Sequence, residues 1–230
     1  MPLPAATDEG DFFFIERDDP DAVVSTVRDL VTARIPRRFG LDPRQDIQVL
    51  TPMRKGVLGT ANLNKELQAL VNPGGPSVGR GGMELRAGDR VIQMRNNYAQ
   101  GVFNGDVGAV TGIDESARTV TVSYDERSVL YEAADLDQLS LAYACSIHKS
   151  QGSEFPAVVI VLHTQHYVLL KRALLYTAVT RARKLAVIVG SRRALAIAVK
   201  NVGTVERCTR LAERLRSYFP YRGPSAAQAR

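Results

Sequence analysis

The sequence predicts an α/β domain that is interrupted by a small antiparallel β-barrel. Two uninterrupted apolar runs, residues 156–162 and 185–189, are typical of strands buried on both faces of a parallel sheet. Strand-like and helical patterns alternate on either side of the middle of the chain, as they do in α/β domains. From residue 83 to about residue 141, short segments are separated by turn residues, which indicates antiparallel strands.

The front part of the chain predicts two pairs of a strand followed by a helix. An Asp-Asp-Pro sequence suits the start of the first helix, and glycine or proline follows each helix. The expected elements are a strand at 12–15, a helix that begins at 18–20 and stops at Gly40, a strand at 47–50, a loop at 51–56, a helix at 60–71 and a break at 72–76.

The rest of the chain is divided by the same reasoning. Residues 119–124 alternate with period two, and Asn104-Gly105-Asp106 is a turn signal. The expected elements are short strands at 89–94, 106–113, 119–124 and 129–132, a strand at 156–162, a helix at 169–183, a strand at 185–189, a helix from Ser191 to about 200, and a helix capped by Thr204 with Val205, Cys208, Leu211 and Leu215 inward. The predicted domains are an acidic N-terminal extension at 1–11, a discontinuous α/β lobe at 12–81 and 141–218, an insert at 82–140, and a loose tail at 219–230.

Charge is distributed unevenly along the 230 residues, which carry a formal net charge of +6. Residues 1–139 hold 15 basic and 21 acidic side chains, whereas residues 140–230 hold 15 basic and 3 acidic ones. This surplus favours a polyanionic partner such as nucleic acid or nucleotide phosphate, and a solvated basic face is the alternative. Two cysteines and no apolar run of about 18 residues lead us to expect a cytoplasmic protein without a membrane span.

Neither Walker motif is found. Gly74 and Gly79 have the separation of a phosphate-binding loop, but Arg80-Gly81 stands where that loop needs Lys and Ser or Thr. We therefore expect residues 74–81 to be a flexible linker into the barrel. Tyr124-Asp125-Glu126 resembles an acidic strand end, yet the preceding segment alternates in polarity, so we interpret it as a hairpin turn. The chain therefore has no visible means of holding Mg-ATP by itself.

Two polar clusters flank the last buried strands. Residues 148–154 hold a His, a Lys, two Ser, a Gln, a Gly and a Glu, directly before the strand at 156–162. Thr177 and Arg181 lie four residues apart and share a face of the predicted helix, near the end at which a fixed guanidinium can stabilise a transferred phosphoryl group. Taken alone, the first cluster could cap a short helix, and Arg181 could be a surface residue.

Together, Arg54, residues 148–156 and residues 176–183 resemble motifs IV, V and VI of superfamily 1 helicases, in the order and spacing of the second motor lobe. The strings Ser-Ile-His-Lys-Ser-Gln-Gly-Ser-Glu-Phe and Tyr-Thr-Ala-Val-Thr-Arg-Ala are most similar to the RecD-like helicases. In that family an SH3-like barrel interrupts a RecA-like lobe of the P-loop NTPase type, and residues 88–91 and 103–108 fit the barrel. The resemblance covers residues 12–215, and the first lobe is missing.

The resemblance implies a role for each matching residue. Arg181 would be the arginine finger, and Arg54 a second γ-phosphate sensor. Glu154 would bind the ribose, Gly152 would allow a close approach, and Gln151 would serve nucleotide or DNA. The implied DNA contacts are Thr51, His148, Lys149 and Ser150 in the lobe, and Arg95, Asn96, Asn97 and Tyr98 in the barrel. His163 and His166 have no partners at ligand spacing, so no metal site is expected in this chain.

The implied function is the C-terminal half of an ATP-dependent DNA helicase that moves 5′ to 3′ along single-stranded DNA. The expected partners are single-stranded DNA, duplex junctions and the N-terminal helicase lobe, which would hold ATP and Mg²⁺. The chain alone is predicted to be inactive. Two alternatives stay open at this point: a non-catalytic DNA-binding or interaction module derived from such a lobe, and a superfamily 1 relative outside the RecD group.

Overall fold

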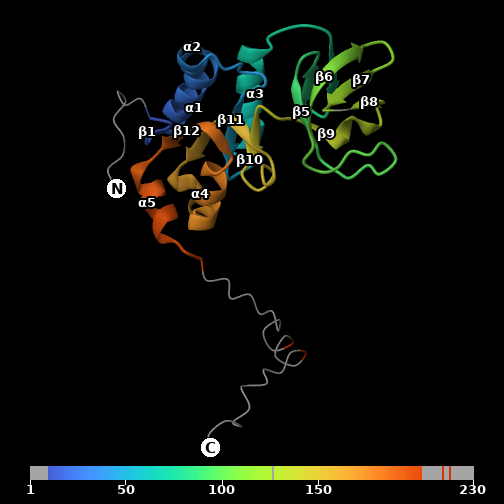
Figure 1. Ribbon diagram of the computed structural model, residues 1–230. Helices are drawn as coiled ribbons and strands as arrows, with labels where there is room; N and C mark the ends of the chain where they lie inside the picture. The colour runs from blue at the N-terminus through green and yellow to red at the C-terminus, as the bar shows by residue number, and fades with distance from the viewer. Residues whose placement is uncertain (1–9, 126, 204–213, 215–217, 219–230) are drawn as a thin grey trace, which may run out of the picture.

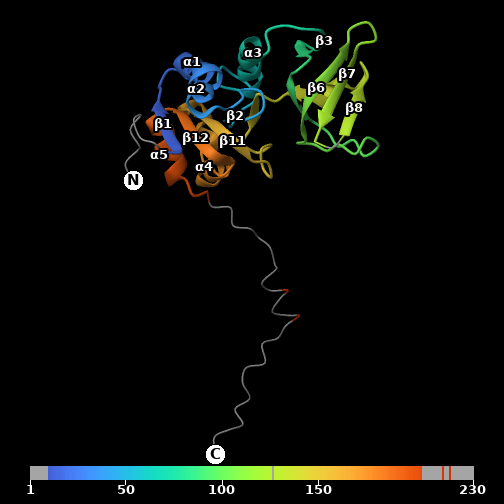
Figure 2. The same cartoon turned by 45° about the horizontal axis from the view of Figure 1, so that its top comes forward.

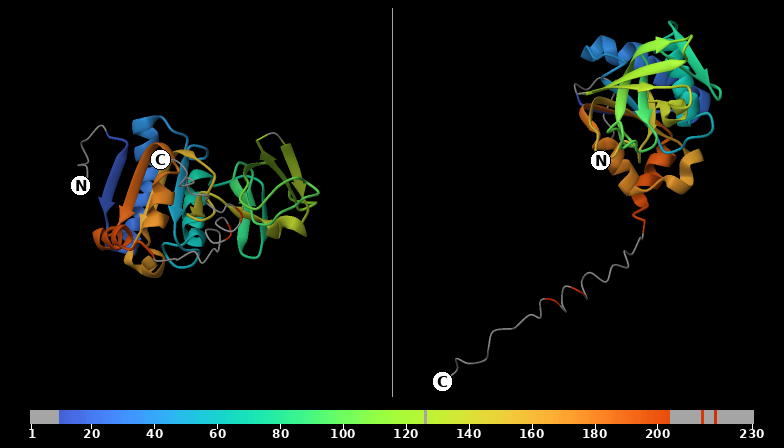
Figure 3. Two further views of the ribbon diagram at one scale, coloured as in Figure 1. Left: turned by 60° about the horizontal axis from the view of Figure 1, so that its bottom comes forward. Right: turned by 90° about the vertical axis from the view of Figure 1, so that its right-hand side faces the viewer.

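The computed structural model describes residues 10–125, 127–203, 214 and 218. Most of the predicted N-terminal extension, Glu126, the helix expected from Thr204 with Val205, Cys208, Leu211 and Leu215, and the tail at 219–230 lie outside the described residues. A lobe built on one sheet and an insert built on another lie beside each other (Figures 1 and 3). In the described part of the chain, no helix is long and apolar enough to cross a bilayer.

A five-stranded parallel sheet forms the centre of the lobe. Its strand order is β1 (Phe12–Glu16), β12 (Ala182–Gly190), β11 (Phe155–Leu162), β2 (Ile47–Thr51) and β10 (Ala144–Ser146). The central register pairs Val159 of β11 with Val49 on one side and with Val187 on the other. Residues 157–162 are buried along their whole length, which confirms the strand predicted from the apolar run.

Helices cover both faces of this sheet (Figure 2). On one face, α1 (Pro20–Asp29) and α3 (Thr60–Val71) place Val27, Leu63 and Leu67 in one apolar cluster with alternate residues of β2, β11 and β12. On the other face, α4 (Arg172–Val179) and α5 (Arg192–Lys200) pack Ala178 and Ala194 against the intervening residues of the same strands. The alternation of side chains along each strand divides the apolar core in this way.

The first helix is longer and less regular than a plain α-helix. A π-helical stretch, Leu30–Arg34, joins α1 to α2 (Ile35–Phe39), and Gly40 ends α2 in the left-handed conformation with φ 65°. Pro36 explains the irregularity, because it has no N–H to donate to the preceding turn and its ring clashes with the carbonyl four residues back. A widened turn relieves that clash without ending the helix.

The insert is a five-stranded antiparallel sheet at residues 90–141. Its strand order is β8 (Arg127–Tyr131), β7 (Thr119–Tyr124), β6 (Val107–Asp114), β5 (Arg90–Gln93) and β9 (Leu139–Leu141), with a 3₁₀ turn at Asp135–Gln138 before β9. Val120, Val122 and Tyr124 of β7 point inward and alternate with half-buried residues, as the period-two pattern predicted. Asp125 lies in the turn between β7 and β8, as expected.

Two predictions of local structure were wrong. The expected linker is an ordered hairpin, β3 (Ser77–Arg80) with β4 (Met83–Arg86), because Val78 and Leu85 pair across it and are buried in the apolar core. The helix expected at 169–183 is instead a 3₁₀ turn, Thr164–Leu169, then α4, then the start of β12. The hydroxyl of Thr180 donates to the carbonyls of Tyr176 and Thr177, and the chain then joins the sheet beside Phe155, so α4 ends at Val179.

Candidate nucleotide and nucleic-acid site

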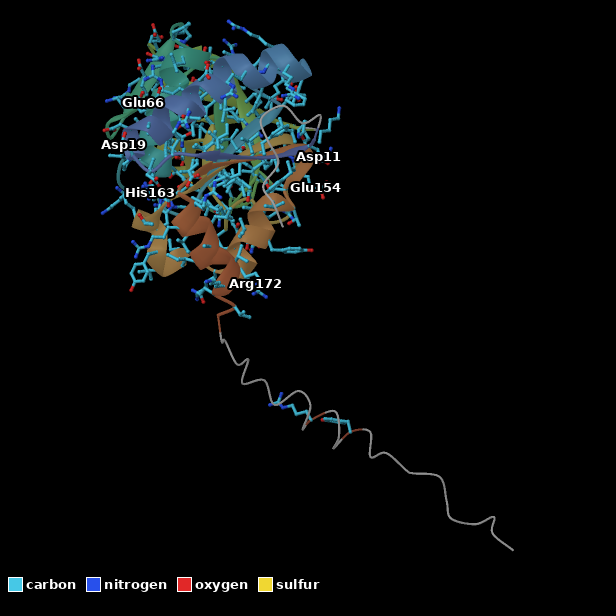
Figure 4. The ribbon with its side chains drawn as sticks, turned by 90° about the vertical axis from the view of Figure 1, so that its left-hand side faces the viewer. Asp11, Asp19, Glu66, Glu154, His163 and Arg172 are labelled. Carbon is cyan, nitrogen blue, oxygen red and sulfur yellow. The ribbon has the colours of Figure 1, made fainter. Side chains whose placement is uncertain are left out.

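Residues of the candidate site lie at opposite ends of the parallel strands. Arg54 follows β2 and Lys149 follows β10, so both lie at the carboxyl edge of the sheet. Glu154 precedes β11 and Arg181 precedes β12, so both lie at the amino edge. Figure 4 shows this division: Asp11 and Glu154 lie at one end of the sheet, and Asp19 and His163 at the other. The structure therefore does not bring Arg54 and Arg181 to the same edge.

One short stretch, residues 147–154, joins the two edges, and we call it the crossover segment. It folds into consecutive turns in which the N–H groups of Lys149 and Ser150 donate to the carbonyl of Ser146. His148, Gln151, Gly152 and Glu154 are exposed along it. The crossover segment is therefore the element that can contact ligands at both edges.

Ser150 does not share that exposure. Its side chain is 2% exposed, and its hydroxyl donates to the carbonyl of Ile147 over 2.8 Å. The hydroxyl stabilises the turn that presents its neighbours, and the DNA contact expected at Ser150 stays a prediction.

Gly152 adopts a backbone conformation that favours glycine, with φ 88°. No atom lies within 4 Å of the position a Cβ would occupy, so the backbone faces open space. A side chain here would be strained and would also fill that space. The geometry is compatible with the close ligand approach that the sequence suggested.

Thr51 is fully buried at the end of β2. Its hydroxyl donates to the carbonyl of Leu58 over 2.7 Å and closes the loop at 52–58. Gly59 is needed for the same closure, because a Cβ there would lie 2.5 Å from the carbonyl oxygen of Arg54. The side chain of Thr51 thus shapes the loop from which Arg54 projects into solvent, and the DNA contact expected at Thr51 stays a prediction.

The guanidinium of Arg181 ties the end of α4 to the crossover segment. Its Nε donates to the carbonyl of Thr177 over 3.1 Å, and one terminal nitrogen donates to the carbonyl of Ser153 over 2.9 Å. The other terminal nitrogen donates to the hydroxyl of Thr180 over 3.2 Å. Three of its five N–H groups are thereby used, which leaves two for a ligand.

Glu154 forms an ion pair with Arg183, in which the guanidinium Nε lies 3.1 Å from a carboxylate oxygen. The two side chains are 52% and 63% exposed, so the pair is solvated and contributes little to stability. Sequence reasoning did not assign Arg183 to the site. Its position one residue into β12, beside the start of β11, was the signal available for it.

Two hollows adjoin the crossover segment. A hollow of about 340 Å³ lies between it and α4, and His148, Gln151, Lys171 and Thr177 contribute to its wall. A larger cleft of about 1090 Å³ separates the amino edge from the insert and includes Glu154 and Arg183. The crossover segment thus has an accessible space on either side.

Lys149 connects the crossover segment to the insert. Its ammonium lies 3.0 Å from the sulfur of Met94 and 3.4 Å from the side-chain oxygen of Asn104, at the two ends of residues 94–106, which we call the insert loop. Burial lowers the pKa of Lys149, the Cys145 thiol opposes that shift, and the positive charge of Arg54 lowers the pKa further. Arg54 and Lys149 are therefore electrostatic neighbours at the carboxyl edge.

The insert loop presents the residues predicted to touch DNA. The backbone N–H of Asn104 donates to the side chain of Asn96, whose amide donates to the hydroxyl of Tyr98. Tyr98 is 78% exposed, and its ring meets that of Phe103 edge-on with centroids 5.9 Å apart. Sequence reasoning did not select Phe103 and Asn104, which the structure places beside Tyr98 and Lys149, although the turn signal at Asn104 marked the place.

Arg95 and Asn97 have local partners as well. Arg95 pairs with Asp137 at 3.3 Å, and both side chains are largely exposed. Asn97 forms an isolated β-bridge with Val102, and its amide donates to the side chain of Gln100. Asn97 therefore closes the inner part of the insert loop, at residues 97–102, while Arg95 keeps an accessible guanidinium.

No metal centre is evident in the described ranges, where no three His, Cys, Asp or Glu side chains gather. His163 caps the 3₁₀ turn before α4, and one of its ring nitrogens lies 2.8 Å from the carbonyl oxygen of Asp18. His166 is buried, and burial together with neighbouring His163 lowers its pKa to about 4. Both histidines have structural contacts.

The parallel sheet with helices on both faces and the inserted antiparallel sheet define the chain as a RecA-like lobe that carries a small β insert. Two family models match it: "ATP-dependent RecD-like DNA helicase SH3 domain" over residues 63–124 and "UvrD-like helicase C-terminal domain" over residues 141–189. The first match begins inside α3, ahead of the insert boundary that we predicted at residue 82. The chain belongs to the RecD-like helicase family, of which it carries these two domains.

Individual relatives agree with this placement. The chain is 45% identical over 172 residues to the ATP-dependent RecD2 DNA helicase of Deinococcus radiodurans, a match that covers 75% of this chain and 24% of that protein. It is 29% identical over 182 residues to the RecBCD enzyme subunit RecD of Mycolicibacterium smegmatis, covering 78% and 31%. The chain thus spans about a quarter to a third of these relatives.

A solved structure has the same fold. The Bacteroides Pif1 helicase in complex with ADP-AlF3 and ssDNA matches with a TM-score of 0.50 and 20% identity, over 86% of this chain and 51% of that one. At this identity the likeness concerns the fold alone.

Proposed function

We propose that the chain is the C-terminal half of the motor of an ATP-dependent DNA helicase. The observation that carries this proposal is the crossover segment, which links a cationic, aromatic-flanked carboxyl edge to the amino edge that holds Glu154 and Arg181. A single eight-residue segment in contact with both edges is suited to couple two ligands. The relative from Deinococcus radiodurans is named as an ATP-dependent DNA helicase, which supports this proposal.

The carboxyl edge is the proposed path of single-stranded DNA. Arg54, Lys149 and exposed His148 would follow the phosphate backbone, while Tyr98 and Phe103 offer ring faces on which bases can stack. Arg95 and Asn96 would add polar contacts from the insert loop. Binding of this kind tolerates any sequence and weakens as salt is added. A duplex junction would meet the same surface at the insert.

Thr51, Ser150 and Asn97 would act by positioning the DNA contacts. The hydroxyls of Thr51 and Ser150 donate to backbone carbonyls, and the amide of Asn97 donates to the side chain of Gln100. Each of these bonds stabilises a turn beside an exposed cation or aromatic ring.

The crossover segment and the amino edge are the proposed nucleotide side. Glu154 can accept a hydrogen bond from a ribose hydroxyl once its ion pair with Arg183 is broken. Gly152 leaves room for the ligand, and Gln151 lines the hollow beside α4. Arg181 would direct its two remaining N–H groups at the γ-phosphate and stabilise the charge that develops during transfer. Because Arg54 starts from the opposite edge, it can act on the same nucleotide only if the nucleotide lies along the crossover segment.

ATP and Mg²⁺ would be held mainly by the N-terminal lobe. The described residues offer neither a phosphate-binding loop nor a gathering of acids that suits Mg²⁺. ATP bound between the two lobes would draw them together, and hydrolysis would release them. Because each lobe would bind the DNA strand in turn during this cycle, the protein would move along that strand. We propose 5′-to-3′ movement and a cytoplasmic location from the family resemblance alone.

A chimaera tests the proposal. Residues 12–203 would replace the matching segment of the Deinococcus radiodurans relative, which supplies the remaining length. We expect ATP hydrolysis stimulated by single-stranded DNA and unwinding of a forked duplex, whereas the 230-residue chain alone shows neither. A folded chimaera that binds DNA but never hydrolyses ATP would favour the alternative, a non-catalytic DNA-binding module.

A further inference from the structure

A buried carboxylate sits where the insert joins the lobe. Asp89 immediately precedes β5 and is 0% exposed. One oxygen accepts from the side-chain amide of Gln68 over 2.6 Å and from the backbone N–H of Arg86 over 2.7 Å. The other accepts from the amide of Asn72 over 2.7 Å and from the hydroxyl of Tyr143 over 2.9 Å.

These four donors come from three separate parts of the chain. Gln68 lies in α3 and Asn72 at its end, Arg86 ends the hairpin that leads into the insert, and Tyr143 belongs to the stretch that returns to the lobe. No cation lies within 4.0 Å of Asp89 among the residues that the structure describes. The direct partners of this buried carboxylate are therefore the four hydrogen-bond donors, and each bond requires its segment to stay in place.

The end of α3 is fastened to the insert by further bonds. Gln68 also donates to the carbonyl of Glu84, and Asn72 to that of Ala87. In the other direction, the guanidinium of Arg86 donates to the carbonyl of Asn72 over 2.8 Å. Carbonyls at a helix end need such partners, so these bonds stabilise α3 and the root of the insert together.

Asp89 directly precedes β5, so the hydrogen bonds to its carboxylate hold the first end of that strand in place. The other end of β5 leads directly into Met94, which contacts the ammonium of Lys149. A tilt of the insert about Asp89 would therefore move the insert loop relative to the crossover segment. α3 lies between the lobe sheet and the insert, as this requires (Figure 1).

We propose that Asp89 is a positioning residue that fixes the orientation of the insert on the lobe and so keeps the insert loop against Lys149. Its effect on DNA binding rests on the proposed function, whereas its effect on the orientation does not. The hydroxyl of Tyr143 acts with it as a donor. Burial, the charge of Asp89 and the hydrogen bond to it all raise the pKa of Tyr143, so that donor stays protonated.

Two variants disturb the hydrogen bonds of Asp89 to different degrees. Asp89→Asn keeps the size of the side chain but replaces one accepting oxygen by a donating NH₂. Because the backbone N–H of Arg86 keeps the amide oxygen on its own side, the NH₂ faces the donating amide of Asn72, which cannot turn without losing its bond to Ala87. Tyr143→Phe deletes one of the four donors, together with the hydroxyl oxygen that faces the backbone of Arg90. The matched control is Asp114→Asn, which alters a carboxylate that is bonded only within its own turn, at Ser116 and Ala117.

The orientation can be measured between two spin labels by pulsed electron paramagnetic resonance. Labels at Asp21→Cys on α1 and Ser128→Cys on β8 report lobe and insert, with Cys208→Ser as background and Cys145 buried. We expect one narrow distance in the parent and in Asp114→Asn. A broadened or shifted distance is expected in Asp89→Asn, and a smaller change in Tyr143→Phe.

Binding to a fluorescent oligo-dT is measured in the same samples, and we expect it to weaken at least fivefold in Asp89→Asn only. Should Asp89→Asn fail to fold by circular dichroism, Tyr143→Phe carries the test. Unchanged distances in a folded Asp89→Asn, or in Tyr143→Phe when Asp89→Asn does not fold, would overturn the proposal. If the parent does not bind oligo-dT, the proposed function fails, and the distances still decide the role of Asp89.

Discussion

The two edges of the lobe sheet differ in how their charged side chains are engaged. At the carboxyl edge, Arg54 projects into solvent and Lys149 contacts only neutral groups, a thioether and an amide oxygen. At the amino edge, Arg181 is bonded to two carbonyls and a hydroxyl, and Glu154 is paired with Arg183. In the proposed function, a polyanion at the carboxyl edge would break no ion pair of Arg54 or Lys149, whereas a ligand at the amino edge would have to displace internal bonds of Arg181 and Glu154.

The largest expected effect concerns Arg181. In the chimaera, Arg181→Ala should lower ATP turnover by about 10³-fold or more, because a guanidinium at a transferred phosphoryl group contributes that much. Steady-state ATPase at saturating single-stranded DNA measures it. Arg193→Ala, an exposed arginine on α5, is the control and should turn over ATP like the parent. Equal turnover in both variants would remove Arg181 from the reaction.

The next effect is a pH dependence of stability at the carboxyl edge. The pKa of His166 is lowered from 6.5 to about 4 in the folded chain, chiefly by burial. The unfolded chain therefore binds more protons between these pH values, and folding stability falls as pH drops from about 6.5 towards 4, by about 3 kcal/mol in total.

Urea unfolding at a series of pH values measures this loss. His166→Gln, which cannot take up the proton, should flatten the profile over that range. A variant profile as steep as the parent profile would assign the acid sensitivity to other groups.

A smaller effect is expected on DNA affinity at the carboxyl edge. Tyr98→Ala and Lys149→Ala should each weaken binding of oligo-dT to the 230-residue chain by about tenfold, through lost stacking and a lost phosphate contact respectively. Fluorescence anisotropy at several salt concentrations separates the two, since only Lys149→Ala should reduce the salt dependence. Lys65→Ala, an exposed lysine on α3, is the matched control. Identical affinities in all four proteins would contradict a DNA path along this edge.

The smallest effect concerns the ion pair at the amino edge. Glu154→Gln should change the free energy of unfolding by less than about 1 kcal/mol, because both partners are more than half exposed. In the chimaera, the same change should raise KM for ATP, since the ribose would lose a charged acceptor. A KM equal to that of the parent would leave Glu154 without a role in nucleotide binding.

Much of the fold was accessible from the sequence, because apolar runs and periodicity report burial directly. The helix at 60–71 and the strands at 119–124 and 156–162 followed from pattern alone. The hairpin at 77–86 did not, since its glycines suggest a linker and only the burial of Val78 and Leu85 makes it a pair of strands. The short strand β10 was missed because three residues carry no readable period.

The candidate site could be proposed from the sequence as a set of residues, but its arrangement in space could not. The polar strings marked residues 148–154 and Arg181, but which hydroxyls would be buried depended on local turns: Thr51 and Ser150 donate to carbonyls that no pattern identifies. The separation of Arg54 from Arg181 depended on strand direction, which only the assembled sheet defines. The contact between Lys149 and the insert loop joins residues 45 and 55 positions apart, beyond the reach of local patterns.

Photocrosslinking tests the division between the two edges most directly. The 230-residue chain would be irradiated with single-stranded DNA that carries 5-bromodeoxyuridine, and the crosslinked peptides identified by mass spectrometry. We predict crosslinks in the insert loop, at Tyr98 and Phe103, and at His148 of the crossover segment, with none at residues 181–183. Crosslinks confined to the amino edge, or to α1 and α2, would contradict the account.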